Sequence, residues 1–280
     1  MFKPNIHHVE GGVGKHIQFT SILKNIREKY NQKLVITSAF PEIFEHSPHV
    51  AYSSIWNHNV FSNETTSRFN QYDNIFFKDP YRSDWLKGDI HVIKKWAELY
   101  EVEIDDIRPD FNINVDLEKQ LMPHIQAIGK FILLQFTGGQ AIQEKLYNKH
   151  NIGRNYLYGQ ELIKLIQESF PNHIIITFGH SNEQAEYQGE TKFNNQTGEL
   201  LFKTREDFII LSKHCDFFIS IDSALQHICS NKNFNKKGIV LWGLTDPNRF
   251  GYESNINLIS SYPNCVEIEP KKIIDEALKL

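Results

Sequence analysis

The sequence predicts an α/β protein with two parallel sheets, one in each half of the chain. In both halves, strand-length apolar runs alternate with segments of helical periodicity, which is the pattern of parallel βαβ units. The runs at residues 131–136, 173–178 and 216–221 are largely apolar, as expected for strands buried on both faces. They are followed by a hydroxyl, a glycine or an acid, at the edge where α/β sheets bind ligands. The expected organisation is therefore two Rossmann-like domains.

The composition is that of an ordinary globular protein. The chain has 280 residues, of which 40% are hydrophobic and 23% are charged, enough for one large core or two modest ones. A net charge of −4 gives no overall attraction to nucleic acid, although a basic patch around Lys232, Lys236 and Lys237 remains open. Three cysteines without metal-ligand spacing indicate reduced thiols and a cytoplasmic protein. Without a signal peptide or an apolar run near the ~20 residues of a membrane helix, any contact with the inner membrane would be peripheral.

The first half begins with a strand and a glycine-rich loop. Apolar side chains at residues 19, 22, 23 and 26 then keep helical spacing. The polar stretch 41–72 is expected to form a long loop or short irregular helices on the acceptor side. The predicted elements are a strand at 5–9, a helix at 17–30, strands at 33–37 and 74–77, and a helix at 90–100.

The second half continues the same alternation from about residue 130. We place the domain boundary near residue 125, so that the predicted domains are 1–125 and 126–280. The predicted elements of this half are strands at 131–136, 173–178, 216–221 and 239–242, and helices at 159–170, 204–214 and 270–280.

The most specific motif follows the strand at 216–221. Asp222 and Ser223 come directly after it, and Ser223 is a natural N-cap for a helix. Free backbone N–H groups and a partial positive charge at that helix start would suit a phosphorylated ligand. The strand at 239–242 ends in a Gly-Leu-Thr-Asp-Pro loop at 243–247, which is expected at the same edge of the sheet.

These two segments resemble the donor-binding region of the ADP-heptose heptosyltransferase family. That family has the GT-B fold, in which two Rossmann-like domains place their parallel sheets across a cleft and the last helix often returns to the first domain. Its motifs are Asp-Ser/Thr-Gly-x-x-His after one strand and Phe-Gly-Pro-Thr-Asp-Pro after the next. Ala224 and Leu244 depart from them by replacing Gly and Pro. The matching residues are Asp222, Ser223, His227, Gly243, Thr245, Asp246 and Pro247.

The resemblance extends to other candidate donor-binding residues. Thr137 and the two glycines after it would leave backbone N–H groups bare for a pyrophosphate. Arg154 fits a basic slot of the family and would offset the charge of the departing nucleoside diphosphate, replacing a metal. Asp222 would accept hydrogen bonds from sugar hydroxyls. The predicted donor residues are Thr137, Gly138, Gly139, Arg154, Gly179, Asp222, Ser223 and His227.

The glycine-rich loop after the first strand is the candidate catalytic segment. The family has Gly-Gly-x-Gly-Asp here, and its acid is implied to be the base for the acceptor hydroxyl. Lys15 replaces that acid and could instead hold a phosphate. Glu10 and His16 are the candidate replacements, and His16 has the better intrinsic pKa. The plainer alternative is a tight turn with His16 exposed on the first helical turn. The glycines of this loop are Gly11, Gly12 and Gly14.

The same loop also resembles the Gly-Gly-Val-Gly-Lys-Thr of deviant Walker A ATPases. His16, however, stands where such a loop has the Ser or Thr that holds Mg²⁺. A P-loop-like ATPase is therefore a lesser alternative, which predicts Mg²⁺-dependent ATP binding that is lost in Lys15→Ala.

By resemblance, the predicted activity is an inverting transfer of sugar from a nucleoside-diphosphate sugar, with no metal and no further cofactor. No histidine lies at zinc-ligand spacing and no Asp-x-Asp pair is present. The acceptor expected from the family is a glycan or glycolipid of the lipopolysaccharide core. Hydroxymethylated bases of phage DNA, in an infected cytoplasm, are a second acceptor class. A non-catalytic protein that binds sugar nucleotides is a further alternative, because Lys15 replaces the family acid.

Overall fold

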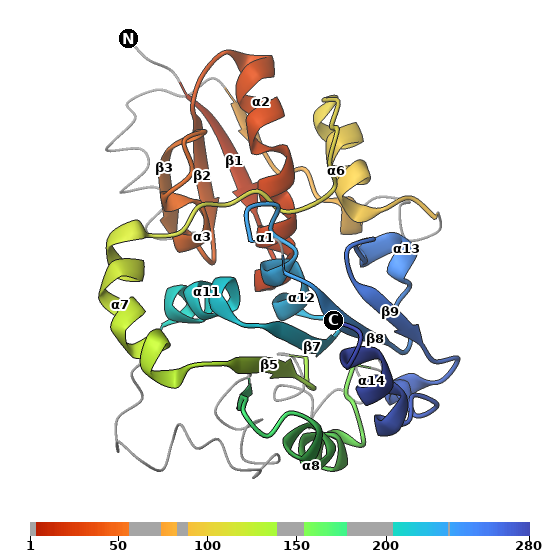
Figure 1. Cartoon of the computed structure of the whole chain (residues 1–280). Helices are drawn as coiled ribbons and strands as arrows, with labels where there is room; N and C mark the ends of the chain where they lie inside the picture. The colour runs from red at the N-terminus through yellow and green to blue at the C-terminus, as the bar shows by residue number, and fades with distance from the viewer. Residues whose placement is uncertain (1–3, 56–73, 83–88, 139–153, 178–203, 235) are drawn as a thin grey trace. The chain divides into compact units, whose positions relative to one another are not determined.

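The chain folds into two compact units, each with one parallel sheet (Figure 1). The first unit comprises Met1–Asn114 with Asn231–Asn233, and the second comprises Val115–Ser230 with Phe234–Leu280. The parallel sheets confirm the predicted α/β class. The computed structural model describes residues 4–55, 74–82, 89–138, 154–177, 204–234 and 236–280.

The first unit contains a four-stranded parallel sheet with the order β3-β2-β1-β4. The chain winds outwards from β1 through β2 to β3 and then returns to add β4 on the other side of β1. This reversal makes the carboxyl edge between β1 and β4 the switch point of the sheet, where α/β folds bind ligands. The elements are β1 (Asn5–Val9), α1 (Val13–Phe19), η1 (Thr20–Ile22), α2 (Leu23–Tyr30), β2 (Leu34–Ser38), α3 (Glu42–Glu45), β3 (Val50–Ile55), β4 (Asn74–Phe76), η3 (Pro80–Arg82) and α6 (Val92–Tyr100).

The helix predicted over 17–30 is broken by a 3₁₀ turn. The Thr20 hydroxyl donates to the Ile17 carbonyl oxygen at 2.6 Å, an alternative bond of the kind that makes threonine a weak interior helix residue. In the described part of the polar stretch 41–72, α3 is a short helix of the kind expected there, whereas strand β3 was not predicted. Strand β3 is at the sheet edge and half exposed, so its sequence lacks the apolar run of a buried strand.

The second unit contains a five-stranded parallel sheet with the order β6-β5-β7-β8-β9. Its switch point lies between β5 and β7, because the chain moves out to β6 and returns past β5. Helix α7, which carries an internal proline, and the edge strand β9 were not predicted from the sequence. The elements are α7 (Val115–Ile128), β5 (Phe131–Gln135), α8 (Gly159–Ser169), β6 (Ile174–Thr177), α11 (Arg205–His214), β7 (Phe217–Ile221), α12 (Ala224–Cys229), β8 (Gly238–Trp242), α13 (Pro247–Phe250), β9 (Ile256–Ile259), η6 (Pro263–Cys265) and α14 (Pro270–Ala277).

A close approach of β7 and β8 requires glycine at position 238. Gly238 is paired with Phe218, and a Cβ atom there would lie 2.3 Å from a carbon of the Phe218 ring. We expect Gly238→Ala to lower the free energy of unfolding by about 1–3 kcal/mol, because the buried ring has to leave its place. Thermal unfolding would measure the loss. Gly12→Ala is the matched control, since its Cβ would have no neighbour within 4 Å, and equal melting temperatures for the two variants would contradict this account.

His7 links the stability of the first unit to pH. Its ring is fully buried and stacks on Phe76, and neither ring nitrogen has a hydrogen-bond partner among the described residues. Burial, followed by the charge of Lys78, lowers the pKa of His7 from 6.5 to about 3. Between these two pH values the unfolded chain binds a proton that the folded chain does not. The contribution of the neutral His7 ring to the free energy of unfolding is therefore fully present above pH 6.5 and is lost as the pH drops towards 3.

We expect His7→Phe to flatten this dependence on pH. For the wild type, His7 alone should remove about 2 kcal/mol of unfolding free energy between pH 7.5 and pH 5. Urea unfolding at the two pH values would measure the difference. His124→Gln, at an exposed histidine, should keep the wild-type slope. An unchanged slope in His7→Phe would show that this ring is not the proton-linked group.

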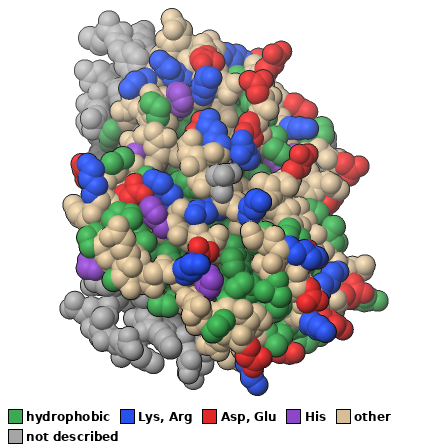
Figure 2. Space-filling view, in the orientation of Figure 1, with side chains coloured by type: hydrophobic (Ala, Val, Ile, Leu, Met, Phe, Trp, Pro, Cys, Tyr) green, Lys and Arg blue, Asp and Glu red, His purple; other side chains and the backbone are tan. Residues whose placement is uncertain are grey.

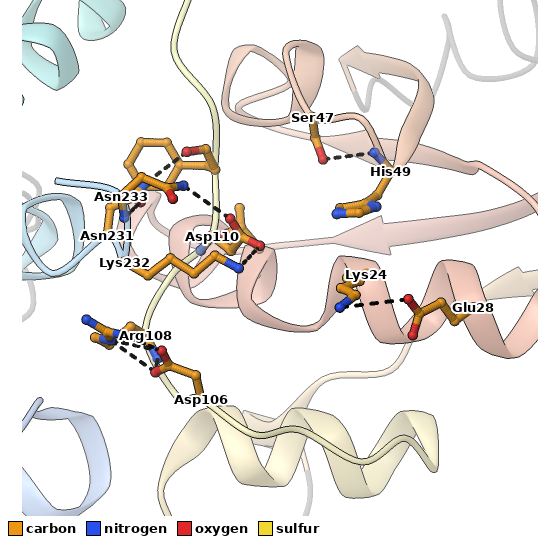
Figure 3. Close-up of polar contacts among 12 residues, drawn as sticks. Lys24, Glu28, Ser47, His49, Asp106, Arg108, Asp110, Asn231, Lys232 and Asn233 are labelled. Carbon is orange, nitrogen blue, oxygen red and sulfur yellow. Dashed lines mark hydrogen bonds and ion pairs between the residues drawn. The ribbon is translucent and has the colours of Figure 1, made fainter.

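Three residues that follow α12 belong to the first unit (Figure 3). The Lys232 backbone N–H donates to the Pro109 carbonyl oxygen at 3.0 Å, and the Lys232 ammonium pairs with Asp110. The Lys236 ammonium donates to the Cys215 carbonyl oxygen at 2.7 Å in the second unit. Two of the three lysines considered for a basic patch are thus engaged within the protein. On the face shown in Figure 2, acidic and basic side chains are interspersed rather than gathered by sign.

The three cysteines, Cys215, Cys229 and Cys265, are free and buried. Among the helices that the structure describes, none has the length and apolar character needed to cross a membrane.

Candidate active site

Most predicted site residues in the described part of the chain lie near the switch points of the two sheets. In the first unit, the loop from Glu10 follows β1, which is paired with β4. In the second unit, Thr137 and Asp222 follow β5 and β7, which are paired with each other. Each switch point places the loops after the two strands that flank it at one edge of the sheet. The sheet orders therefore bring together residues that the sequence only placed on separate strands.

Arg154 is the central basic residue of the second unit's site. Its backbone carbonyl accepts from the Gly138 N–H at 3.2 Å, and Thr137 and Asn155 form an antiparallel bridge. The guanidinium donates twice to the Asp222 carbonyl oxygen, from Nε at 3.2 Å and from Nη2 at 2.5 Å. Because two bonds fix its plane, Arg154 holds a positive charge at the carboxyl end of β7.

Asp222 and Ser223 are organised by a glutamine that the sequence analysis missed. Asp222 is 6% exposed, and its Oδ1 accepts from Gln226 Nε2 at 2.6 Å. Gln135 Oε1 accepts from the Ser223 hydroxyl and from the Leu225 backbone N–H. Ser223 is thus the N-cap residue of α12, as predicted, but Gln135 supplies the oxygen that satisfies the helix start. The Leu225 N–H, one of the groups at this helix start that were expected to be free, is therefore satisfied within the protein. The available signal was one amide within the apolar run 131–136.

His227 has a buried, structural setting. It is 4% exposed, and its Nδ1 lies 2.8 Å from the Tyr252 hydroxyl. Its ring meets the Tyr252 ring edge-on. Asp246, in the loop after β8, also has a structural contact. It is the N-cap residue of α13, and its side chain accepts from the Asn248 N–H. Two of the predicted donor residues, Gly139 and Gly179, lie outside the described residues.

In the first unit, His16 holds the glycine-rich loop in place. Its ring is fully buried, with Nδ1 2.9 Å from the Gly12 carbonyl oxygen and Nε2 3.0 Å from the Val9 carbonyl oxygen. Burial lowers the pKa of His16 to about 4, and these two carbonyls oppose the shift. The alternative with an exposed His16 is therefore wrong, and both nitrogens face the main chain rather than solvent. Around it, Gly11 adopts a φ of +99° and Gly14 lies in the first turn of α1.

Lys15 is paired with an acid that the sequence analysis did not identify. Its ammonium lies 2.6 Å from Asp79 Oδ2 and 4.8 Å from the centre of the Tyr81 ring. The Lys15 and Asp79 side chains are only 11% and 13% exposed. Asp79 comes shortly after β4, so its position at the end of a predicted strand was the available signal. The lysine that a P-loop would aim at phosphate is engaged by a carboxylate.

Glu10 is the more exposed carboxylate at this edge. Its side chain is 44% exposed, and Oε1 lies 3.4 Å from Nε2 of the buried His8. A small pocket opens beside it, lined by His8, Glu10, Phe77, Lys78, Asp79 and Trp96.

Within the described part of the chain, no three His, Cys, Asp or Glu side chains come together as metal ligands would.

Comparison with known proteins gives one family and several similar structures. The family model for glycosyltransferase family 9 (heptosyltransferase) matches residues 65–273. A family 9 glycosyl transferase from Veillonella parvula is 12% identical, with a TM-score of 0.72 over 99% of this chain and 96% of that one. The ADP-heptose lps heptosyltransferase II of E. coli is 11% identical, with a TM-score of 0.69 over 99% and 98%.

A third similar structure is the E. coli heptosyltransferase WaaC with ADP-2-deoxy-2-fluoro heptose. It is 10% identical, with a TM-score of 0.62 over 99% of both chains. No curated protein sequence matches the chain significantly. At these identities the structural likeness establishes the fold, and it confirms the predicted GT-B class.

Proposed function

Because the chain belongs to glycosyltransferase family 9, the heptosyltransferase family, we propose that it transfers a sugar from a nucleoside-diphosphate sugar with inversion and without a metal. The observation that carries this proposal is the position of Arg154. Its guanidinium is fixed on the Asp222 carbonyl at the switch point of the second sheet. A fixed cation at this edge suits a diphosphate leaving group.

The donor half of the reaction follows from the second unit. In a direct displacement, the acceptor oxygen bonds to the sugar C1 as the bond from C1 to the diphosphate oxygen breaks. The diphosphate leaves with the electron pair, so negative charge grows on its oxygens. Arg154 would stabilise that charge through charge-assisted hydrogen bonds. With one oxygen held by Gln226, the Asp222 carboxylate is oriented to accept from a sugar hydroxyl.

The acceptor half follows from the first unit, where we assign the base to Glu10. A base has to reach the acceptor proton and keep a lone pair for it. Both nitrogens of His16 face main-chain carbonyls, and Asp79 is bound to the Lys15 ammonium. Glu10 is 44% exposed beside the pocket that includes Phe77 and Asp79. We propose that a hydroxyl of a glycan or glycolipid acceptor lies there.

Nucleotide binding without metal tests the donor half. We expect one nucleoside diphosphate among ADP, UDP and GDP to bind in EDTA as tightly as in Mg²⁺, because Arg154 supplies the positive charge. ADP is the first to test, since the E. coli heptosyltransferase WaaC was solved with ADP. Isothermal titration calorimetry would measure the dissociation constants. Binding only of Mg²⁺-ATP, and its loss in Lys15→Ala, would favour the ATPase alternative instead.

A further inference from the structure

Three polar side chains form a line from the core of the first sheet to its carboxyl edge. Nδ1 of His8 lies 3.1 Å from the Thr37 hydroxyl oxygen, and Nε2 lies 3.4 Å from Oε1 of Glu10. Thr37 is fully buried and His8 is 3% exposed, whereas the Glu10 side chain is 44% exposed. The line thus connects a rigid interior to one half-exposed carboxylate.

The register of the sheet sets the inner end of this line. His8 on β1 is paired directly with Thr37 on the parallel strand β2. Glu10 is two residues beyond His8, and alternate residues of an extended chain point to the same side. Both contacts therefore follow from the backbone of the sheet. The Phe77 ring, whose centre is 5.1 Å from that of His8, packs against the imidazole from the loop after β4.

The chemistry of the three groups gives the line a direction. A neutral imidazole has one N–H donor and one acceptor nitrogen, and an ionised carboxylate can only accept. If the Thr37 hydroxyl donates to Nδ1, the proton of the ring is on Nε2, which is the nitrogen nearer to Glu10. The outer contact, with 3.4 Å between Nε2 and Oε1, does not have the geometry of a hydrogen bond in this structure. Hydrogen bonds of catalytic groups often tighten only when substrate binds.

The other charged groups described at this edge have partners other than His8, whereas the carboxylate of Glu10 lies 3.4 Å from Nε2 of His8. Asp79, on the loop after β4, is held by the Lys15 ammonium from α1. The Lys78 ammonium donates to the Leu99 carbonyl oxygen at 2.5 Å and lies 5.0 Å from the Tyr100 ring centre. His16, from α1, has its nitrogens on the Val9 and Gly12 carbonyls.

We infer that His8 is a positioning residue for the catalytic base and that Thr37 fixes its tautomer. This inference rests on the proposed role of Glu10. In the transfer step, the proton of the acceptor hydroxyl moves to the Glu10 carboxylate while the new bond to C1 forms. His8 directs its Nε2–H towards one oxygen of the carboxylate, so that the other oxygen faces the acceptor. The contribution of His8 and Thr37 is orientation, which is worth about 10- to 100-fold in rate when it is lost.

Matched pairs of variants test this role. Thr37→Val removes the hydroxyl at nearly constant shape, whereas Thr37→Ser keeps it. His8→Phe removes the donor to Glu10, whereas His8→Gln keeps an N–H near the position of Nε2. We expect kcat to fall about 10- to 100-fold in Thr37→Val and His8→Phe, with KM for the donor and the melting temperature near wild type. Thr37→Ser and His8→Gln should recover most of the activity. Equal kcat values within each pair would overturn the inference.

A double-mutant cycle separates this inference from the proposed function. If His8 acts only through Glu10, His8→Phe should have no further effect on kcat in the Glu10→Gln background. Full activity of Glu10→Gln alone would refute the proposed base. An inactive Glu10→Gln with a fully active His8→Phe would keep the base and refute the positioning role.

A measurement without turnover checks the tautomer. In ¹⁵N-histidine-labelled protein, the imidazole nitrogen shifts should identify His8 as the Nε2–H form. Glu10→Gln should shift the His8 Nε2 signal while leaving the His16 signals unchanged. A proton on Nδ1 in the wild type would overturn the assignment whatever the activity data show.

Discussion

Glu10→Gln is expected to lower kcat by about 10²- to 10⁴-fold and to leave the affinity for the nucleoside diphosphate unchanged. The amide keeps the size of the side chain and loses the ability to take a proton. Nucleotide binding is assigned to the second unit, so it should not respond to a change after β1. Steady-state kinetics would give kcat, and calorimetry with the diphosphate found to bind would give the dissociation constant.

Asp79→Asn is the matched control, because Asp79 is the other carboxylate that lines the same pocket. Its removal leaves the Lys15 ammonium without its 2.6 Å partner, so we expect a lower melting temperature and a smaller effect on kcat. The opposite result, an active Glu10→Gln and an inactive Asp79→Asn, would move the base to the loop after β4.

Arg154→Ala is expected to weaken nucleoside-diphosphate binding and to lower kcat by about 10²- to 10³-fold, because the charge of the leaving group loses its fixed partner. Arg154→Lys should fall between the alanine variant and the wild type, since lysine restores the charge but not the planar fork that spans the Asp222 carbonyl. Calorimetry and product-release kinetics at constant ionic strength would measure both effects.

Arg108→Ala serves as the control for a general loss of positive charge. Arg108 belongs to the first unit, where its guanidinium pairs with Asp106 at 2.6 Å (Figure 3). We expect this variant to bind the nucleotide as the wild type does. If Arg154→Ala binds the nucleotide as tightly as Arg108→Ala does, then Arg154 has only a structural contact with Asp222 and the donor phosphates bind elsewhere.

Local sequence was enough to predict most of the strands and helices, because secondary structure depends largely on interactions between residues that are near neighbours in the chain. The apolar runs at 131–136, 216–221 and 239–242 form β5, β7 and β8, and their alternation with helices predicted parallel sheets. Elements without such a local signature were missed. Edge strands β3 and β9 are half exposed, and α7 carries an internal proline.

The family resemblance was also visible in local motifs, since Asp222, Ser223 and the loop at 243–247 lie close together in the chain. A motif of this kind records which residues follow a strand. It does not record which strand lies beside it. The sequence could therefore name Arg154 and Asp222 as separate candidates without showing that one holds the carbonyl of the other.

What the sequence by itself determined is the pair of parallel sheets, the loops after their strands and the family. Only the tertiary structure decided which side chains contact each other in the sites, because the order of the strands brings together residues that are far apart in the chain. Lys15 and Asp79 are 64 residues apart, Arg154 and Asp222 are 68 apart, and Gln135 and Ser223 are 88 apart. Burial made the same kind of decision for His16, whose intrinsic pKa suited a base until folding placed both nitrogens against carbonyl oxygens. The charge, partner and solvent access of a side chain are properties of its surroundings, and those surroundings exist only once the two strands at each switch point lie side by side.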